Sequence, residues 1–514
     1  MKRHQKHICI LAFIIVAYIL LPVMNADYLY TIQDNGVFIS GHTFMMDTVR
    51  HEGGWTAWAA RYLTQFFYHP WLGSTILILF WVAIYWITIQ MFRISNKWSP
   101  LALIIPAILL YHLLDYGYWI YYAKLPGLPF QPTIMVLLCL LFTWGVILLT
   151  RKLNISWNKK GLIAVSLLGA ILYVGNMLWP SSPWHYNYSF RHSILTTLTD
   201  RNFKHELRMY RALDEGRFDA VLEEMPKDGE KPPTNLMVMY KNIALMHTGR
   251  LTDLFKTNNC GTHPDMGKTL NLHISQLGAP LIYYQFGQFN YAYRWAMENS
   301  VEYGLSFRNL KMMAQCAIWN SDIDVAVKYL TLLKSSTFHR KWAKEHEAWV
   351  YDHNTFMRSQ DYQNLSQLMQ DEDNVLDNDN SLCEKYLLDH FSDLLTPNNP
   401  KLEEVIMCLS LWTEDTYSFS LHFYNYVHRH PGEAIPELYQ QGAILLCNTE
   451  QSPVQLDNFP FDQQVASRYN RFVQDYNSLS SQNMDDKEMA ERLRPLYGDT
   501  FWWYHYFYTD FQIY

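Results

Sequence analysis

The first 180 residues of this 514-residue sequence contain a series of long apolar runs, and these runs restrict the fold more than any other feature. A run of about 20 apolar residues is long enough for one helix to cross the hydrocarbon core of a membrane. Only helices and closed barrels satisfy their backbone hydrogen bonds there. We therefore predict a transmembrane domain at residues 1–180 with about five helices, at residues 8–24, 71–92, 99–118, 133–150 and 161–179.

The first run has two interpretations, because a basic segment precedes it, as in a secretory signal peptide. Cleavage requires small residues before the cut, and Ala26 fits this pattern whereas Met24 does not. We favour an uncleaved helix. Both interpretations place the following loop, residues 25–70, outside the cytoplasm.

Basic residues are concentrated in three places: the N-terminus, the Arg93 and Lys97 connection, and the connection at 151–160. Lys and Arg accumulate in cytoplasmic loops. The pattern predicts a bacterial inner-membrane protein with a cytoplasmic N-terminus, and everything after Trp179 is expected in the periplasm.

The external loop at 25–70 is acidic, and three of its carboxylates are candidate catalytic residues: Asp34, Asp47 and Glu52. A carboxylate next to the membrane can act as a general base or hold a divalent cation. The simpler interpretation is that these residues keep an exposed loop soluble. The same loop contains Trp55 to Tyr68, whose aromatic residues recur at helical spacing and predict an amphipathic helix on the membrane surface.

The chain after residue 190 has amphipathic helical patterns and an internal repeat. The segment that begins at Gly216 recurs 33 positions later at Gly249, and the segment at Gly287 recurs 34 positions later at Ser321. A period of about 34 residues is typical of tetratricopeptide units, which stack helical hairpins into a solenoid. The predicted fold is therefore all-α: a transmembrane bundle followed by a tetratricopeptide-like α-solenoid at 190–514. The aromatic end of the chain, from Thr500, either caps this solenoid or contacts the membrane.

Several classes of function lack support in the sequence. The formal net charge of −7 and the absence of a basic stripe argue against nucleic-acid binding. The seven cysteines are single, without metal-ligand or disulfide-framework spacing. We found no nucleotide-binding, hydrolase or zinc-protease motif, so no cofactor or metal is predicted.

Four segments resemble a family of uncharacterised inner-membrane proteins of the Bacteroidetes. They begin at Tyr28 (Tyr-Leu-Tyr-Thr-Ile-Gln-Asp-Asn-Gly-Val-Phe), Gly53 (Gly-Gly-Trp), Leu63 (Leu-Thr-Gln-Phe-Phe-Tyr-His-Pro-Trp-Leu-Gly-Ser) and Tyr497 (Tyr-Gly-Asp-Thr-Phe-Trp-Trp-Tyr). The resemblance covers most of the chain. It implies location and architecture, and no catalytic residue follows from it.

Two functions follow as hypotheses. The first is a non-enzymatic membrane scaffold whose helical repeats bind other envelope proteins. The second is an enzyme, or enzyme subunit, of envelope glycan or lipid assembly that uses the external loop, because the order of its segments is similar to that of polytopic glycosyltransferases. A transporter component is less favoured, because the apolar runs contain few charges and no inverted halves. In each case the lipid bilayer is a partner.

Overall fold

The computed structural model describes residues 5–51, 54–115, 128–152, 201–226, 233–256, 278–369, 387, 391, 400–446 and 459–508. Over these residues the chain is helical and contains no β-strand, as the sequence predicted. The chain forms two compact units: residues 1–204 with 296–351, and residues 205–295 with 352–514. The predicted boundary at 180–190 and the predicted helix at 161–179 lie outside the described residues.

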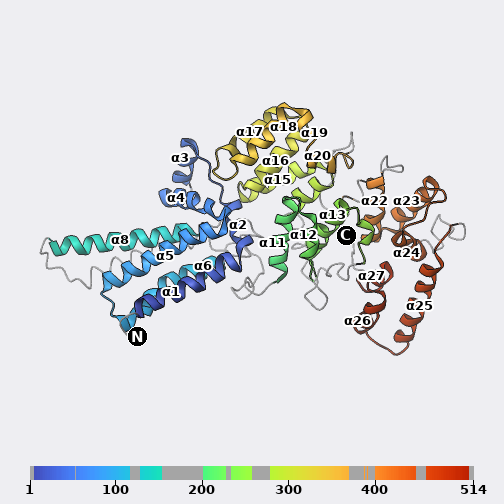
Figure 1. Ribbon diagram of the computed structural model, residues 1–514, viewed down its shortest axis with the longest axis horizontal. Coiled ribbons are helices and arrows are strands. Elements are labelled where there is room, and N and C mark those ends of the chain that lie inside the picture. Colours follow the sequence, from blue (N-terminus) through green and yellow to red (C-terminus); the bar gives the residue numbers. More distant parts are fainter. Residues whose placement is uncertain are drawn as a thin grey trace. The chain divides into compact units, whose positions relative to one another are not determined.

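Four helical segments of the first unit are long and apolar enough to cross a membrane: Gln5–Val23, Pro70–Phe92, Asn96–Leu114 and Phe130–Leu148. They correspond to the first four predicted spans. Helix α5 (Pro70–Phe92) packs against the other three, which contain α1 (Gln5–Tyr18), α6 (Ile104–Asp115) and α8 (Phe130–Lys152) (Figure 1). Tyr85 of α5 donates to the carbonyl of Lys6 (2.9 Å), and Tyr18 bonds Thr75 (2.7 Å). Helices α1 and α5 are therefore antiparallel.

Proline explains two irregular stretches in these segments. Pro22 has no N–H and its ring crowds the preceding turn, and the chain widens into a π-helix (η1, Ile19–Val23) around it. The third segment begins as a 3₁₀ helix (η3, Asn96–Leu103) that contains Pro100 and becomes α-helical at Ile104. Pro106 lies in the first turn of α6.

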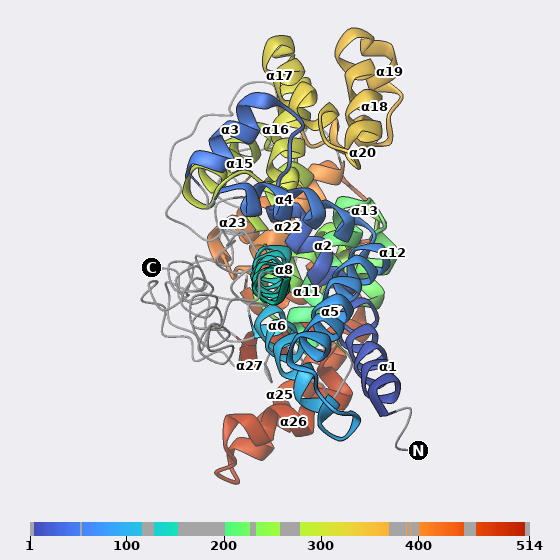
Figure 2. The same ribbon diagram turned by 90° about the vertical axis from the view of Figure 1, so that its left-hand side faces the viewer.

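The external loop folds into α2 (Ala26–Asn35), α3 (His42–His51), α4 (Gly54–Thr64) and the 3₁₀ helix η2 (Gln65–Tyr68). Gly73 of α5 is required here, because a Cβ on it would lie 2.4 Å from Cδ1 of Phe67. The first unit also contains α16 (Phe307–Trp319), α17 (Ile323–Lys334) and α18 (Arg340–Tyr351). Helix α16 packs against both of these helices and against α2 (Figures 1 and 2).

Five helix ends in the described residues share one turn geometry. A residue with positive φ follows the first helix, its N–H bonds to the carbonyl three positions back, and the next N–H bonds to the carbonyl five positions back. At the first turn these bonds are Gly216 N to Leu213 O (3.0 Å) and Arg217 N to Ala212 O (2.8 Å). This is the Schellman motif, which satisfies the last carbonyls of a helix. The five positions are Gly216, Gly249, Gly287, Ser321 and Glu414, with φ of 68°, 67°, 77°, 60° and 56°.

Except for the turn at Ser321 between α16 and α17, these turns belong to the second unit. Its helices begin with α11 (Arg201–Asp214), shared with the first unit over its first four residues. Next come α12 (Phe218–Glu223), α13 (Asn235–His247), η5 (Leu251–Asp253), a helical stretch at 278–285, and α15 (Phe289–Tyr303), also shared. The remainder are α19 (His353–Met357), α20 (Gln360–Leu365), α22 (Pro400–Trp412), α23 (Thr416–Arg429), α24 (Glu437–Leu446), α25 (Gln463–Ser480), α26 (Asp486–Tyr497) and α27 (Phe501–Tyr508).

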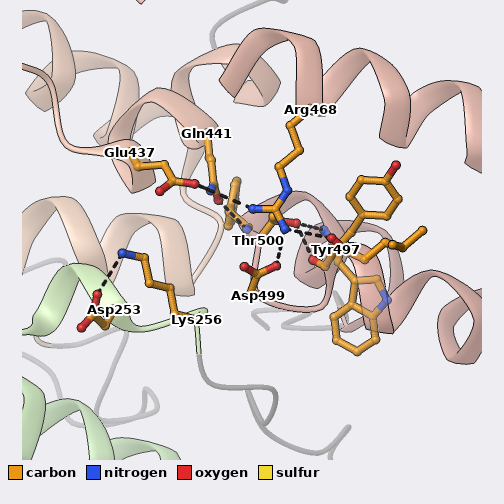
Figure 3. Close-up of polar contacts among 11 residues, drawn as sticks. Asp253, Lys256, Glu437, Gln441, Arg468, Tyr497, Asp499 and Thr500 are labelled. Atoms are coloured by element: carbon orange, nitrogen blue, oxygen red, sulfur yellow. Dashed lines mark hydrogen bonds and ion pairs between the residues drawn. The ribbon is translucent and has the colours of Figure 1, made fainter. Parts of the chain in front are cut away.

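The aromatic α27 is buried inside the second unit. Trp502 donates to the carbonyl of Gln441 (3.1 Å), and Tyr504 donates to the carbonyl of Trp412 (2.9 Å). At the edge of the same contact, Arg468 donates to Asp499 (2.6 Å) and also faces Glu437, as Figure 3 shows. The end of the described chain therefore packs against α22 and α24.

Candidate functional site

The candidate site is the surface of the external loop that contacts α16 and the turn between α17 and α18. We call residues 335–339 the docking turn. Asp34 lies at the end of α2 and is 5% exposed. Its carboxylate accepts a hydrogen bond from the backbone N–H of Arg308 (2.8 Å) and forms an ion pair with Nε of the same residue (3.2 Å). Arg308 is in the first turn of α16, where the helix dipole also favours a negative charge.

The docking turn places an aromatic side chain among the rings of η2 and its neighbour. The Phe338 ring stacks on Tyr68, with centroids 5.2 Å apart and planes 7° apart. It also meets the edges of Phe66 (5.8 Å) and His69 (5.5 Å). The backbone of the turn is fixed as well, since both N and Oγ of Ser40 donate to the carbonyl of residue 335 (3.2 and 2.8 Å).

His339 provides the buried polar contact of the docking turn. Its ring stacks on Phe307 with centroids 4.0 Å apart, and its Nε2 lies 3.0 Å from the amide nitrogen of Gln33. Burial lowers the pKa of His339 to about 2, and the positive charge of Lys311 adds to this effect. The imidazole is therefore neutral at physiological pH, so its Nε2 can accept the hydrogen bond that the Gln33 amide donates.

The three predicted carboxylates do not share one environment. Asp34 is buried against α16, whereas Asp47 is exposed on α3. Glu52 lies outside the described residues. Within the described residues no three His, Cys, Asp or Glu side chains are grouped closely enough to hold a metal ion. Asp34 therefore forms an ion pair that links α2 to α16, two helices that are far apart in the sequence.

Sequence reasoning missed Arg308, Phe338 and His339. Arg308 resembles any surface arginine at the start of an amphipathic helix, so the sequence contained no signal for it. Phe338 did leave a weak signal, because an aromatic residue after Ser-Ser-Thr in a polar turn has no neighbour within its own hairpin to cover it. Sequence alone did not indicate which surface would do so.

Comparisons with known proteins give one family and no function. No curated protein and no solved structure gives a significant match. The profile of a family described as "Family of unknown function (DUF6057)" matches residues 2–190 and 121–508. Since these matches cover nearly the whole chain, the protein belongs to the DUF6057 family of unknown function.

Proposed function

We propose that this protein is a scaffold in the bacterial inner membrane, whose tetratricopeptide-like hairpins bind other envelope proteins in the periplasm. The observation that carries the proposal is the single Schellman geometry repeated at five turns. Helical hairpins that stack side by side form extended protein-binding surfaces. The spacings of 33 and 34 residues agree with the length of a tetratricopeptide unit.

The contacts of the first unit support a topology with five crossings. Lys6 meets Tyr85, and Arg93 follows the last residue of α5, so one end of the bundle is basic. The external loop lies at the other end, where Tyr28 donates to the carbonyl of Leu113 (2.7 Å) and Phe67 contacts Phe130 (5.5 Å). Helix α8 begins at Phe130 and so returns to the basic end.

Helix α16 contacts the external loop, so the chain has to cross the membrane once more between the end of α8 and α16. We assign that crossing to the apolar segment that the sequence predicts at 161–179. Since basic ends face the cytoplasm, α16 to α18 lie in the periplasm in this scheme. Alkaline phosphatase fused after Tyr514 should be active, and a fusion after Lys97 should be silent. The reverse pattern would refute the orientation.

The outer face of α23 is the surface we propose for partner binding. Tyr417 and Tyr424 are seven positions apart and therefore share a helix face, and they are 76% and 42% exposed. Tyrosine is enriched at protein interfaces because it combines a large apolar ring with a polar hydroxyl. The same face continues to His428, which is exposed and lies against the Tyr424 ring (4.0 Å).

Site-specific photocrosslinking in intact cells tests this surface. We would replace Tyr417 with the photoreactive residue benzoylphenylalanine, which preserves an aromatic ring, and use Gln474 on the exposed face of α25 as the control position. The proposal requires a discrete envelope-protein adduct from position 417 that is absent from position 474. Adducts that are missing from 417, or identical at both positions, would reject this surface as the binding site.

The enzymatic hypothesis requires a different test. Asp34→Asn is unsuitable alone, because loss of the Arg308 ion pair would disturb the fold at the same time. Asp47→Asn combined with Glu52→Gln leaves the ion pair between Asp34 and Arg308 in place. If the loop is catalytic, the double variant should fold normally but fail to complement a deletion strain; a scaffold should complement it fully.

A further inference from the structure

Helix α4 has an inverted arrangement of side chains. Its buried face is made of small or polar residues, namely Ala57, Ala60, Arg61 and Thr64. The opposite face carries the large rings, with Trp55 60% exposed and Tyr62 43% exposed. A helix on the surface of a water-soluble protein normally turns its large apolar residues toward the core. An outward aromatic face of this kind marks a surface that contacts something other than water.

The outward face is also uncharged. Arg61 is the one charged residue of α4, and it points inward, where it donates to the carbonyl of Val37 (3.1 Å). The rings are arranged in series: Trp58 is nearly parallel to Tyr62, with planes 13° apart, and meets the edge of Trp55. The ring of Phe38, which is 6% exposed, contacts the rings of both Trp58 and Tyr62.

The position of α4 identifies the occupant of this face. Helix α4 packs against α8, one of the four helices able to cross a membrane (Figure 1). It ends six positions before α5 begins, and the short 3₁₀ helix η2 fills most of that interval. Because such a helix rises only about 2 Å per residue, α4 cannot lie far from the point where α5 enters the membrane. Trp71 and Leu72, in the first turn of α5, are also exposed.

We propose that the aromatic face of α4, formed by Trp55, Trp58 and Tyr62, binds phospholipid at the boundary between headgroups and acyl chains of the leaflet next to the external loop. Trp and Tyr prefer this level of the bilayer, because their rings are apolar and their N–H and O–H groups reach water. Helix α3 packs against α4 and carries the exposed charged residues Asp47 and Arg50. This lipid contact is independent of the protein-binding role proposed for the hairpins.

The lipid contact would also bear on the docking turn. Tyr62 meets Phe66 (5.9 Å), and Phe66 meets Phe338 (5.8 Å), so rings run without a break from the proposed lipid face to the turn. A bilayer that restrains α4 therefore also restrains Phe66, one of the rings that contact Phe338. A detergent micelle has no ordered interface of this kind, so it would restrain α4 and Phe66 less than a bilayer does.

Collision accessibility of a spin label tests the proposal in the full-length protein. Trp55→Cys, in a background with the native cysteines replaced, would carry a nitroxide in nanodiscs of phosphatidylethanolamine and phosphatidylglycerol. Oxygen concentrates in lipid and a nickel chelate remains in water, so their ratio reports the surroundings of the label. The matched control is Asp47→Cys on α3.

We expect an oxygen-to-nickel ratio several-fold higher at position 55 than at position 47, with a similar result for Tyr62→Cys. Equal, water-like ratios at positions 55 and 47 would overturn the proposal, and so would a lipid-like ratio at both positions. Circular dichroism of each labelled variant confirms that the helices are retained. Failure of this test would leave the photocrosslinking result at Tyr417 unaffected, which separates the two proposals.

Discussion

The Asp34→Asn substitution tests how firmly the external loop holds α16. Asparagine retains an oxygen that can accept the N–H of Arg308, but it removes the charge that balances the guanidinium. The side chains of Asp34 and Arg308 are 7% and 15% exposed, so the uncompensated charge would stay largely buried. Removing one partner of a buried ion pair costs about 3 to 5 kcal/mol. Since Arg308 retains some access to water, we expect about 3 kcal/mol, the lower end of that range.

Hydrogen exchange of the α16 amides, measured by mass spectrometry in nanodiscs, reports this change. A loss of about 3 kcal/mol corresponds to a roughly hundredfold increase in the equilibrium for local opening. The control is Asp47→Asn, because this side chain is exposed and the same change should leave exchange in α16 unaltered. Adding Arg308→Met to Asp34→Asn should recover part of the protection, because it removes the unbalanced charge. Unchanged exchange in Asp34→Asn, or no recovery in the double variant, would refute the proposed stabilisation of α16 by the ion pair between Asp34 and Arg308.

Four further outcomes are expected. Gly216→Ala should cost about 1 kcal/mol, because its φ of 68° strains an L-residue although nothing lies within 4 Å. Gly287→Ala should cost at least about 2 kcal/mol in chemical denaturation, because its new Cβ would also lie 3.0 Å from the Leu368 backbone. The hydrogen bond to Glu403 raises the pKa of His430. Its stabilisation is therefore present below about pH 6.5 and lost as pH rises through the raised pKa, so His430→Gln should flatten thermal stability across that window. Trp502→Ala should destabilise the second unit by about 3 to 5 kcal/mol, and an unchanged melting temperature would contradict the burial of α27 in its core.

Local features of the fold were predictable because their causes are local. Length and hydropathy located the second span at 71–92, and the structure gives Pro70–Phe92. Gly216 and Gly287 marked turns because positive φ is costly for other residues. Helical spacing predicted a helix from Trp55, and the structure forms α4 from Gly54 to Thr64 followed by η2.

The candidate site depends on contacts that periodicity does not encode. Gln33 and His339 meet although 306 positions separate them. Helical spacing identifies which face of a segment is apolar, but it does not identify the distant segment that will cover it. Asp34 was singled out for its charge and its closeness to the membrane, yet its surroundings depend on Arg308, whose importance no local pattern reveals. The polar partners of a buried carboxylate therefore had to come from the three-dimensional arrangement.

The first unit is built from two stretches of chain with about 90 residues of the second unit between them. During synthesis, Gln33 emerges long before His339 exists. Gln33 and His339 are 306 positions apart. At about 5 to 20 residues per second, the ribosome needs roughly 15 to 60 s to synthesise the chain between them. During this period Gln33, near the end of α2, lacks the contact that His339 later provides. Assembly of the first unit is thus linked to translation of residues 296–351, and a ribosome stalled before that point would leave this unit incomplete.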